Sequence, residues 1–169
     1  MIDKEGLRPT PDRVRETVFN WLAMDIPRAR VLDCFAGAGG LGLEAASREA
    51  SEVIMVDKDR QVTQSLQQQV ERLKAGNITV VCADIMTFLD DQTEPFDVVF
   101  IDPPYQLSEL RNDVITALLE RDLLNNDAKL YVEWPNQQQM TLYHENLSWI
   151  KQKNAASVCY ALAKWGECR

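Results

Sequence analysis

Apolar positions in this chain form short continuous runs, separated by stretches in which apolar residues recur every three or four positions. The runs are typical of strands buried on both faces of a sheet, and the stretches are typical of amphipathic helices. The pattern predicts strands at residues 29–34, 52–57, 77–84, 96–102 and 129–134. It predicts helices at residues 41–50, 60–75 (closed by Gly76), 85–91 and 108–121, and a weak helix at 137–145. Strands alternating with helices indicate an α/β fold with a doubly wound, mainly parallel sheet.

The two ends of the chain depart from this alternation. Thr10 has the character of an N-cap and Pro11 that of a first-turn proline, so we expect a helix that begins there and ends at Pro27. Residues 147–152 and 157–165 both have strand character, and the four residues between them are too few for a crossover. We therefore expect a Rossmann-like sheet of about seven strands, preceded by an N-terminal helix and ending in a C-terminal antiparallel hairpin.

Length and composition favour one domain over residues 1–169, with residues 1–28 as its N-terminal segment and helix. No apolar run approaches the roughly 20 residues of a membrane-spanning helix, and the start lacks the apolar core of a signal peptide. We expect a cytoplasmic monomer without a membrane partner. Widely spaced cysteines predict reduced, mostly buried thiols rather than a metal site. They are Cys34, Cys82, Cys159 and Cys168.

Charge is unevenly distributed along the chain. The net charge of −8 argues against a nucleic-acid partner, because phosphates are bound mainly by Lys and Arg. Residues 85–150, however, hold twelve acidic and three basic residues, so the rest of the chain is close to neutral. Basic residues gather near the two ends: Lys4, Arg8, Arg13, Arg15, Lys151, Lys153, Lys164 and Arg169. Charge alone does not distinguish two interpretations: these residues lie on ordinary solvated surface, or they form a basic footprint for nucleic acid that is split between the two ends of the chain.

A glycine-rich stretch, VLDCFAGAGGLGLEA, includes the first predicted strand and the turn after it. Gly37, Gly39 and Gly42 form G-x-G-x-x-G, which allows close backbone approach to a ligand at the start of a helix. The glycines alone fit a plain tight turn, an NAD site or a site for another adenosine cofactor. Asp33 precedes them and would repel a pyrophosphate, whereas it suits the cationic sulfonium of S-adenosylmethionine.

Asp57 and Asp84 follow the next two predicted strands and should lie on the same rim of the sheet as Asp33. Asp57 comes 20 residues after Gly37 and suits an acceptor for two ribose hydroxyls. Asp84 could accept a hydrogen bond from an adenine amino group. Each aspartate taken singly is equally compatible with capping a loop.

The tetrapeptide Asp102-Pro103-Pro104-Tyr105 follows the fourth predicted strand. Two prolines supply no backbone N–H, so the loop offers only acceptors beside an aromatic ring. Such a loop suits the amino group of a nucleobase, which would attack a sulfonium methyl group while the tyrosine stacks on the base. We expect Asp102 to stabilise the developing positive charge rather than act as a strong base, because an ordinary aspartate is too acidic. A rigid turn with a surface tyrosine is the alternative.

These motifs resemble, in their order, those of Rossmann-like amino-methyltransferases that use S-adenosylmethionine: VLDCFAGAGGLGLEA, VIMVDKD, VVCAD and FDVVFIDPPY. The opening segment LRPTPDRVRETVFNWL resembles the signature of the RsmD family, which methylates N2 of guanine 966 in 16S ribosomal RNA. The resemblance implies this activity, S-adenosylmethionine as cofactor, and the small ribosomal subunit or its assembly intermediate as partner. Members usually carry a basic, glycine-containing stretch before L-R-P-T, so we expect RNA affinity, and not cofactor binding, to depend on such a stretch.

The resemblance also implies roles for individual residues. The catalytic residues would be those that hold the guanine: Asp102, Pro103, Pro104 and Tyr105. The cofactor-binding residues would lie at three strand ends and at the start of the first helix: Asp33, Phe35, Gly37, Gly39, Asp57, Lys58, Asp84, Ile85, Thr10 and Arg13. Thr10 and Arg13 would border the cofactor's carboxylate or the target nucleotide. The alternative, that they only cap the helix and lie on a solvated surface, is equally compatible with the sequence.

Three further functions stay open at this point. An adenine-N6 DNA methyltransferase also uses D-P-P-Y, although the chain has no evident segment for reading base sequence in a groove. An NAD-dependent oxidoreductase would explain the complete G-x-G-x-x-G. A non-catalytic RNA-binding or assembly factor would keep the fold without the chemistry.

Overall fold

The computed structural model describes residues 10–107 and 109–166, apart from the side chain of Tyr105. The strands are β1 Arg30–Asp33, β2 Glu52–Asp57, β3 Ile78–Cys82, β4 Phe96–Ile101, β5 Leu124–Pro135, β6 Leu147–Ala155 and β7 Val158–Trp165. The helices are α1 Asp12–Trp21, α2 Gly40–Ser47, α3 Arg60–Leu73, α4 Ile85–Asp90 and α5 Leu110–Glu120, with a short 3-10 turn η1 at Tyr105–Leu107.

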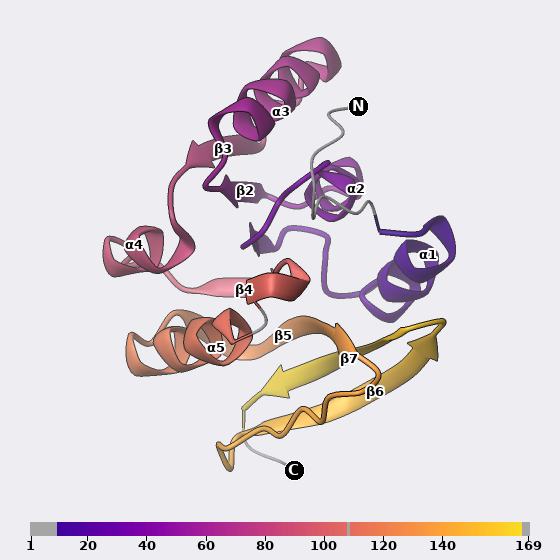
Figure 1. Cartoon of the computed structure of the whole chain (residues 1–169). Helices are drawn as coiled ribbons and strands as arrows, with labels where there is room; N and C mark the ends of the chain where they lie inside the picture. Colours follow the sequence, from indigo (N-terminus) through magenta and orange to yellow (C-terminus); the bar gives the residue numbers. More distant parts are fainter. Residues whose placement is uncertain (1–9, 108, 167–169) are drawn as a thin grey trace.

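All seven strands form one sheet in the order β3-β2-β1-β4-β5-β7-β6 (Figure 1). Strands β1 to β5 pair in parallel, and β7 is antiparallel to both of its neighbours, β5 and β6. The predicted Rossmann-like α/β fold with a C-terminal antiparallel hairpin is therefore confirmed. The reversed strand is not at the edge, because β7 inserts between β5 and β6.

Helices cover both faces of the sheet and give it two cores (Figure 1). On one face, α1, α2 and α3 pack on the sheet through residues such as Phe19, Leu41 and Leu66. On the other face, α4 and α5 pack through residues such as Phe88 and Leu118. Strand β4 is buried between the two layers except at Asp97, which explains why its sequence is apolar almost throughout.

The predicted helix at residues 137–145 is wrong. This segment forms turns and irregular structure between β5 and β6. Side chains hold it in place: Arg111 donates a hydrogen bond to Gln138 (2.9 Å), and the ring of His144 packs on that of Trp165 with centroids 4.9 Å apart. Contacts with distant residues therefore outweigh the weak local helical preference.

Several predicted element ends are shifted by the local backbone. Pro11, and not Thr10, is the N-cap of α1, and its carbonyl accepts a hydrogen bond from the Arg15 N–H (3.0 Å). This helix ends at Trp21, and a series of turns carries the chain to Pro27. Helix α3 is closed by Lys74 in the left-handed conformation (φ 52°) rather than by Gly76.

The cysteines differ in their exposure. Cys34 and Cys159 are buried free thiols as predicted, but Cys82 is exposed because it lies on the edge strand β3; Cys168 lies outside the described residues. Within the described ranges, no group of His, Cys, Asp or Glu side chains has the arrangement of a metal site. None of the described helices combines the length and apolar composition needed to cross a bilayer.

Candidate active site

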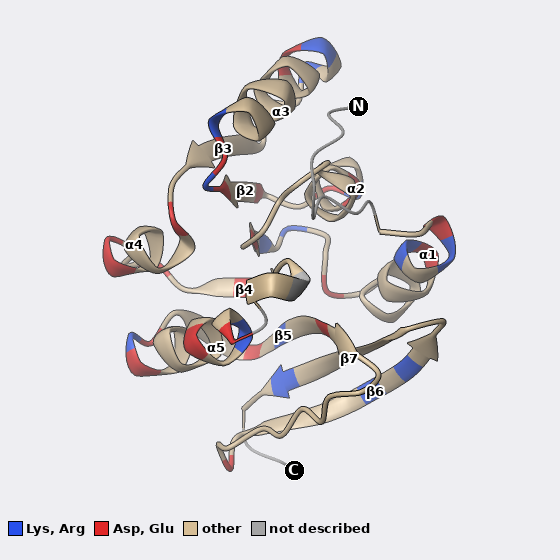
Figure 2. Cartoon of the chain, in the orientation of Figure 1, with Lys and Arg blue, Asp and Glu red and all other residues tan. Residues whose placement is uncertain are grey.

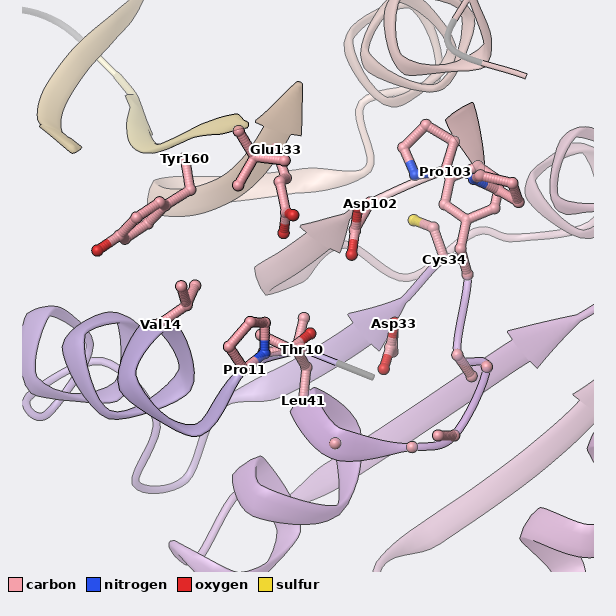
Figure 3. A pocket seen from close by; sticks show the side chains of 18 of the residues that line it. Thr10, Pro11, Val14, Asp33, Cys34, Leu41, Asp102, Pro103, Glu133 and Tyr160 are labelled. Atoms are coloured by element: carbon pink, nitrogen blue, oxygen red, sulfur yellow. The ribbon is translucent and has the colours of Figure 1, made fainter. Parts of the chain in front are cut away.

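A large cavity of about 1080 Å³ lies at the carboxyl ends of the parallel strands (Figure 3). Its wall is built from the glycine loop after β1, the ends of β2 to β5, the start of α1 and the turn between β6 and β7. In a doubly wound sheet this rim is where ligands bind, because the strand order reverses there and the loops separate. The cavity therefore joins the glycine loop and the Asp102 loop, which are far apart in sequence.

Asp33 ends β1 and lies beneath the glycine loop, with only 3% of its surface exposed. Its Oδ2 accepts a hydrogen bond from the Gly42 N–H (3.1 Å), at the first turn of α2. Burial raises the pKa of Asp33 to about 7, and the charge of Asp57 adds to that rise, while the N–H groups of Gly42 and Phe35 lower it. A positively charged ligand group beside Asp33 would stabilise its ionised form.

The glycine loop owes its shape to three different constraints. Gly37 and Gly39 have positive φ values of 53° and 89°, a region that residues with side chains rarely adopt. A Cβ on Gly39 would also lie 2.7 Å from Cδ2 of Leu66. Gly42 instead allows α2 to pack closely on β2, since its Cβ would lie 2.9 Å from the Met55 side chain. Of these three glycines, Gly37 and Gly39 line the cavity and Gly42 does not.

Asp57 and Asp84 lie where the sequence predicts, at the ends of β2 and β3, and both line the cavity. Asp57 accepts hydrogen bonds from the N–H groups of Gly37 (3.1 Å) and Asp59 (2.9 Å), so it fixes the glycine loop as well. Asp84 caps α4 through Oδ1, which accepts from Met86 and Thr87. Capping and ligand binding are compatible here, because a carboxylate has more acceptor positions than these bonds use.

The remaining predicted cofactor residues also line the cavity. They are Phe35, Lys58, Ile85, Thr10 and Arg13. Arg13 is exposed on the first turn of α1, and Thr10 precedes the helix without capping it. The helix-cap interpretation of Thr10 is thus wrong.

The predicted acceptor loop begins directly after β4. Asp102, Pro103 and Pro104 line the cavity, and the carboxyl group of Asp102 points into it (Figure 3). The backbone of Tyr105 starts the turn η1, but its side chain lies outside the described part of the structure, so its stacking role stays a prediction. Asp102 thus faces the same space as Asp33, on the neighbouring strand.

Glu133 is a site residue that the sequence pattern did not indicate. Strands β4 and β5 pair Ile101 with Val132, so the next residue on each strand, Asp102 and Glu133, lie side by side. Their carboxyl groups are joined by a hydrogen bond, and both point into the cavity (Figure 3). The one signal in the sequence was a single acid in the otherwise apolar end of β5, but it becomes informative only when the strand register is known.

Two carboxyl groups in contact perturb one another. Burial raises the pKa of Asp102 well above its usual range, the charges of Glu133 and Asp33 raise it further, and Arg111 partly offsets the rise. Burial also raises the pKa of Glu133, while hydrogen bonds from Tyr131 and Asp102 lower it. The pair therefore holds a proton more tightly than ordinary carboxyl groups. Asp102 is a stronger proton acceptor than the sequence alone suggests.

The charge of the cavity wall fits a cation better than a phosphate. Its described acids are Asp33, Asp57, Asp84, Asp102 and Glu133. Its described basic residues, Arg13, Lys58 and Lys153, are all exposed. In a dinucleotide site the first-turn amides of the helix after β1 bind pyrophosphate, but here Asp33 already occupies the Gly42 N–H. The site thus fits S-adenosylmethionine, which carries positive charge and no phosphate, better than NAD.

Basic residues border the cavity from two sides. Lys153 on β6 and Arg13 on α1 line the cavity, and Lys151 lies two residues before Lys153 on the same strand (Figure 2). The turn after β6 is held to the end of β5, since the Asn136 N–H donates to the Ser157 carbonyl (2.8 Å). Of the predicted footprint, Lys4, Arg8 and Arg169 lie outside the described residues.

Comparison with known proteins gives close matches over most of the chain. A family model described as Conserved hypothetical protein 95 matches residues 1–164. Ribosomal RNA small subunit methyltransferase D of Escherichia coli (strain K12) is 44% identical over 160 residues, covering 95% of this chain and 80% of that protein. The protein of the same name from Haemophilus influenzae is 39% identical, covering 96% of this chain and 85% of its own length.

Solved structures give the same fold. The structure of yhhF from Escherichia coli matches with a TM-score of 0.89 at 41% identity, covering 94% of this chain and 88% of that chain. An rRNA methylase from Streptococcus thermophilus matches with a TM-score of 0.75 at 14% identity, covering 94% of this chain and all of that one. The second similarity concerns the fold alone.

Proposed function

This chain belongs to the RsmD family, described as Conserved hypothetical protein 95, and we propose on that premise that it methylates 16S ribosomal RNA. The methyl donor is S-adenosylmethionine, and the acceptor is the exocyclic N2 of a guanine, guanine 966 by the resemblance of its motifs. The name shared by the relatives from Escherichia coli and Haemophilus influenzae supports the small-subunit RNA as substrate. We propose further that the enzyme acts as a cytoplasmic monomer on the small subunit or its assembly intermediate.

One observation carries the proposal: a loop that offers only acceptors shares a cavity with a buried carboxylate and a glycine loop. The loop, Asp102 to Pro104, suits an amino group, which offers two N–H donors. Asp33, beneath the glycine loop, suits the positively charged part of the cofactor. The two groups that must meet for methyl transfer are thus recognised in one space.

The residues at the first three strand ends would hold the cofactor. Asp33 and the glycine loop would hold its methionine part, Asp57 its ribose hydroxyls, and Asp84, through the oxygen outside the cap, its adenine amino group. When bound, S-adenosylmethionine supplies an electrophilic methyl group on sulfur, and S-adenosylhomocysteine remains after transfer. Most of the rate gain then comes from positioning two bound reactants.

The Asp102 loop would prepare the amino group for attack. Asp102 and the backbone carbonyl of Pro103 would accept its two hydrogens and so direct the nitrogen lone pair toward the methyl group. With the cofactor bound, a bond from N2 to carbon would form as the bond from sulfur to carbon breaks, and positive charge would move to N2. The Asp102 carboxylate would stabilise this charge and take up the extra proton, which burial and Glu133 make it better able to hold.

The test uses labelled S-adenosylmethionine and small ribosomal subunits from a strain that lacks the modification. We expect label in 16S RNA, recovered as N2-methylguanosine, and none when the subunits are already modified. Parallel reactions with naked 16S RNA and with DNA identify the substrate. Absence of label from RNA would contradict the proposal, and N6-methyladenine in DNA would support an adenine-N6 DNA methyltransferase.

A thermal-shift experiment tests whether the chain is instead an oxidoreductase. We expect stabilisation by S-adenosylhomocysteine and none by NAD, because a ligand that binds the folded state raises its melting temperature. Stabilisation by NAD alone would favour an oxidoreductase. RNA binding without methyl transfer would favour a non-catalytic assembly factor.

A further inference from the structure

We propose that Glu133 is the residue that selects guanine at this site, by accepting a hydrogen bond from N1–H of the base while Asp102 accepts one from N2. This inference rests on the proposed function, because it concerns how the same site chooses its base. It assigns to the end of β5 a role that the Asp102 loop cannot supply alone.

The sheet places the two carboxyl groups next to each other. Ile101 and Val132 are partners in the parallel ladder between β4 and β5, and Asp102 and Glu133 are the residues that follow them. Their side chains line one cavity and share a hydrogen bond. Once the proton of that bond has left, the site presents two acceptor groups side by side.

Glu133 is held by residues from three elements. The Tyr131 hydroxyl donates to its Oε2 (2.9 Å), and Tyr131 is fully buried. Arg111 of α5 fixes the backbone below it, because its guanidinium donates to the Glu133 carbonyl (3.1 Å). On the other side, Tyr160 is the ladder partner of Glu133 and stacks on Trp21, with ring centroids 5.5 Å apart. The carboxylate is thus preorganised toward the cavity.

Guanine and adenine differ at the ring nitrogen beside the amino group. In guanine, N1 carries a hydrogen, so N1 and N2 form a continuous row of donors. In adenine, the ring nitrogen beside the N6 amino group is an acceptor. The acceptor loop alone would serve either amino group, but a carboxylate facing a lone pair leaves two acceptors opposed and unpaired. Glu133 therefore favours guanine and disfavours adenine.

The surroundings of Glu133 argue against a purely structural role. Within residues 10–107 and 109–166, no Lys or Arg side chain forms an ion pair with the carboxyl group of Asp102 or Glu133. Arg111 is near enough to lower the pKa of Asp102, but a carboxyl pair that no cation contacts directly is a costly way to stabilise a strand end. A row of N–H donors from the substrate would satisfy both groups.

The experiment compares two bases at the target position of reconstituted small subunits. One substrate carries guanine and the other carries 2-aminopurine, which keeps the amino group but has a lone pair at N1. We expect the wild-type protein to methylate guanine roughly 100-fold more efficiently, measured as kcat/KM. Glu133→Gln can donate to N1, so we expect its preference to fall toward or below one, with unchanged affinity for S-adenosylhomocysteine.

Two further variants serve as a control and as a test of how Glu133 is held. Glu120→Gln makes the same change on the exposed end of α5 and should keep the wild-type preference. Tyr131→Phe removes the hydroxyl that holds Glu133 and should lower the preference only in part. An unchanged preference in active Glu133→Gln would overturn the inference, as would equal loss on both bases in folded protein. Failure of the proposed function has a different signature: the wild-type protein would then methylate neither substrate.

Discussion

The two halves of the cavity hold their carboxyl groups in different ways. In the cofactor half, Asp33, Asp57 and Asp84 accept hydrogen bonds from backbone N–H groups of nearby loops and helix starts. In the base half, Asp102 and Glu133 contact each other, and Tyr131 holds Glu133 through its side chain. In one site, therefore, some carboxyl groups are positioned by neighbouring backbone and others are positioned by the pairing of two strands.

The two kinds of contact also have opposite effects on the ionisation of a carboxyl group. A backbone N–H is a fixed donor that favours the ionised carboxylate, whereas a second carboxyl group disfavours it. We therefore expect substitutions in the base half to affect the chemistry and leave cofactor binding intact. Substitutions in the cofactor half should change stability and cofactor affinity.

The largest expected effect is that of Asp102→Ala on methyl transfer. We expect the rate to fall by roughly 1000-fold or more, because the variant lacks the group that we propose stabilises charge on N2 and takes up its proton. Calorimetry should find wild-type affinity for S-adenosylhomocysteine, since the cofactor half is untouched. Asp113→Ala, on the exposed face of α5, is the matched control. Loss of affinity in proportion to activity would show that the two halves are not separable.

Asp33→Asn should change how the stability of the unliganded protein depends on pH. The pKa of Asp33 is raised from 3.8 to about 7, so between these values the folded state binds more protons than the unfolded state. Stability of the wild-type protein therefore falls as pH rises through this window, and the variant lacks this contribution. We expect the free energy of unfolding of the variant, relative to wild type, to rise by at most about 4 kcal/mol between pH 4 and 8. Denaturant titrations at several pH values measure it, and a constant difference would contradict the burial argument.

Gly39→Ala should weaken the cofactor half through the backbone. The left-handed conformation at φ 89° disfavours a Cβ, and the new atom would lie 2.7 Å from Leu66. We expect a loss of about 1–3 kcal/mol in the free energy of unfolding and weaker binding of S-adenosylhomocysteine. Gly76→Ala is the matched control, because a Cβ there meets nothing within 4 Å. If both variants behave alike, loop strain is not the reason for the glycine.

The smallest expected effect concerns the mouth of the cavity. Lys153→Gln removes one exposed charge from the end of β6, so affinity for small subunits should fall roughly two- to fivefold. The slope of log affinity against log salt should shrink by about 1 if this lysine contacts a phosphate. Lys74→Gln, beyond α3 and away from the cavity, should leave both quantities unchanged. Equal effects of the two substitutions would indicate unspecific attraction.

The same contrast explains what the sequence can and cannot predict. Asp33, Asp57 and Asp84 were found because each follows its own strand, and a parallel sheet brings strand ends to one rim. Glu133 was not found, because its neighbourhood depends on the register between β4 and β5. The turn between β6 and β7 was not predicted as cavity wall either, since that requires knowing that β7 inserts beside β5.

Local errors have a related cause. The segment 137–145 has weak helical preference but is held by Arg111 and Trp165 from distant parts of the chain. The end of α3 is set at Lys74, two residues before the glycine that the sequence favours. In both places a prediction from neighbouring residues misses a contact or a conformation that only the folded chain defines.

Because β7 inserts between β5 and β6, the length of the β6–β7 hairpin sets how far one wall of the cavity extends. Strand β6 runs parallel to β5, and a tight turn connects it to β7. This turn therefore lies on the same rim of the sheet as the cavity, near the edge of the sheet rather than in its middle. One more residue in each of β6 and β7 would extend the wall by about 3.3 Å and leave the two helix layers untouched. Changing the hairpin length could therefore adapt the entrance to a wider or narrower RNA segment while Asp102 and Glu133 stay in place.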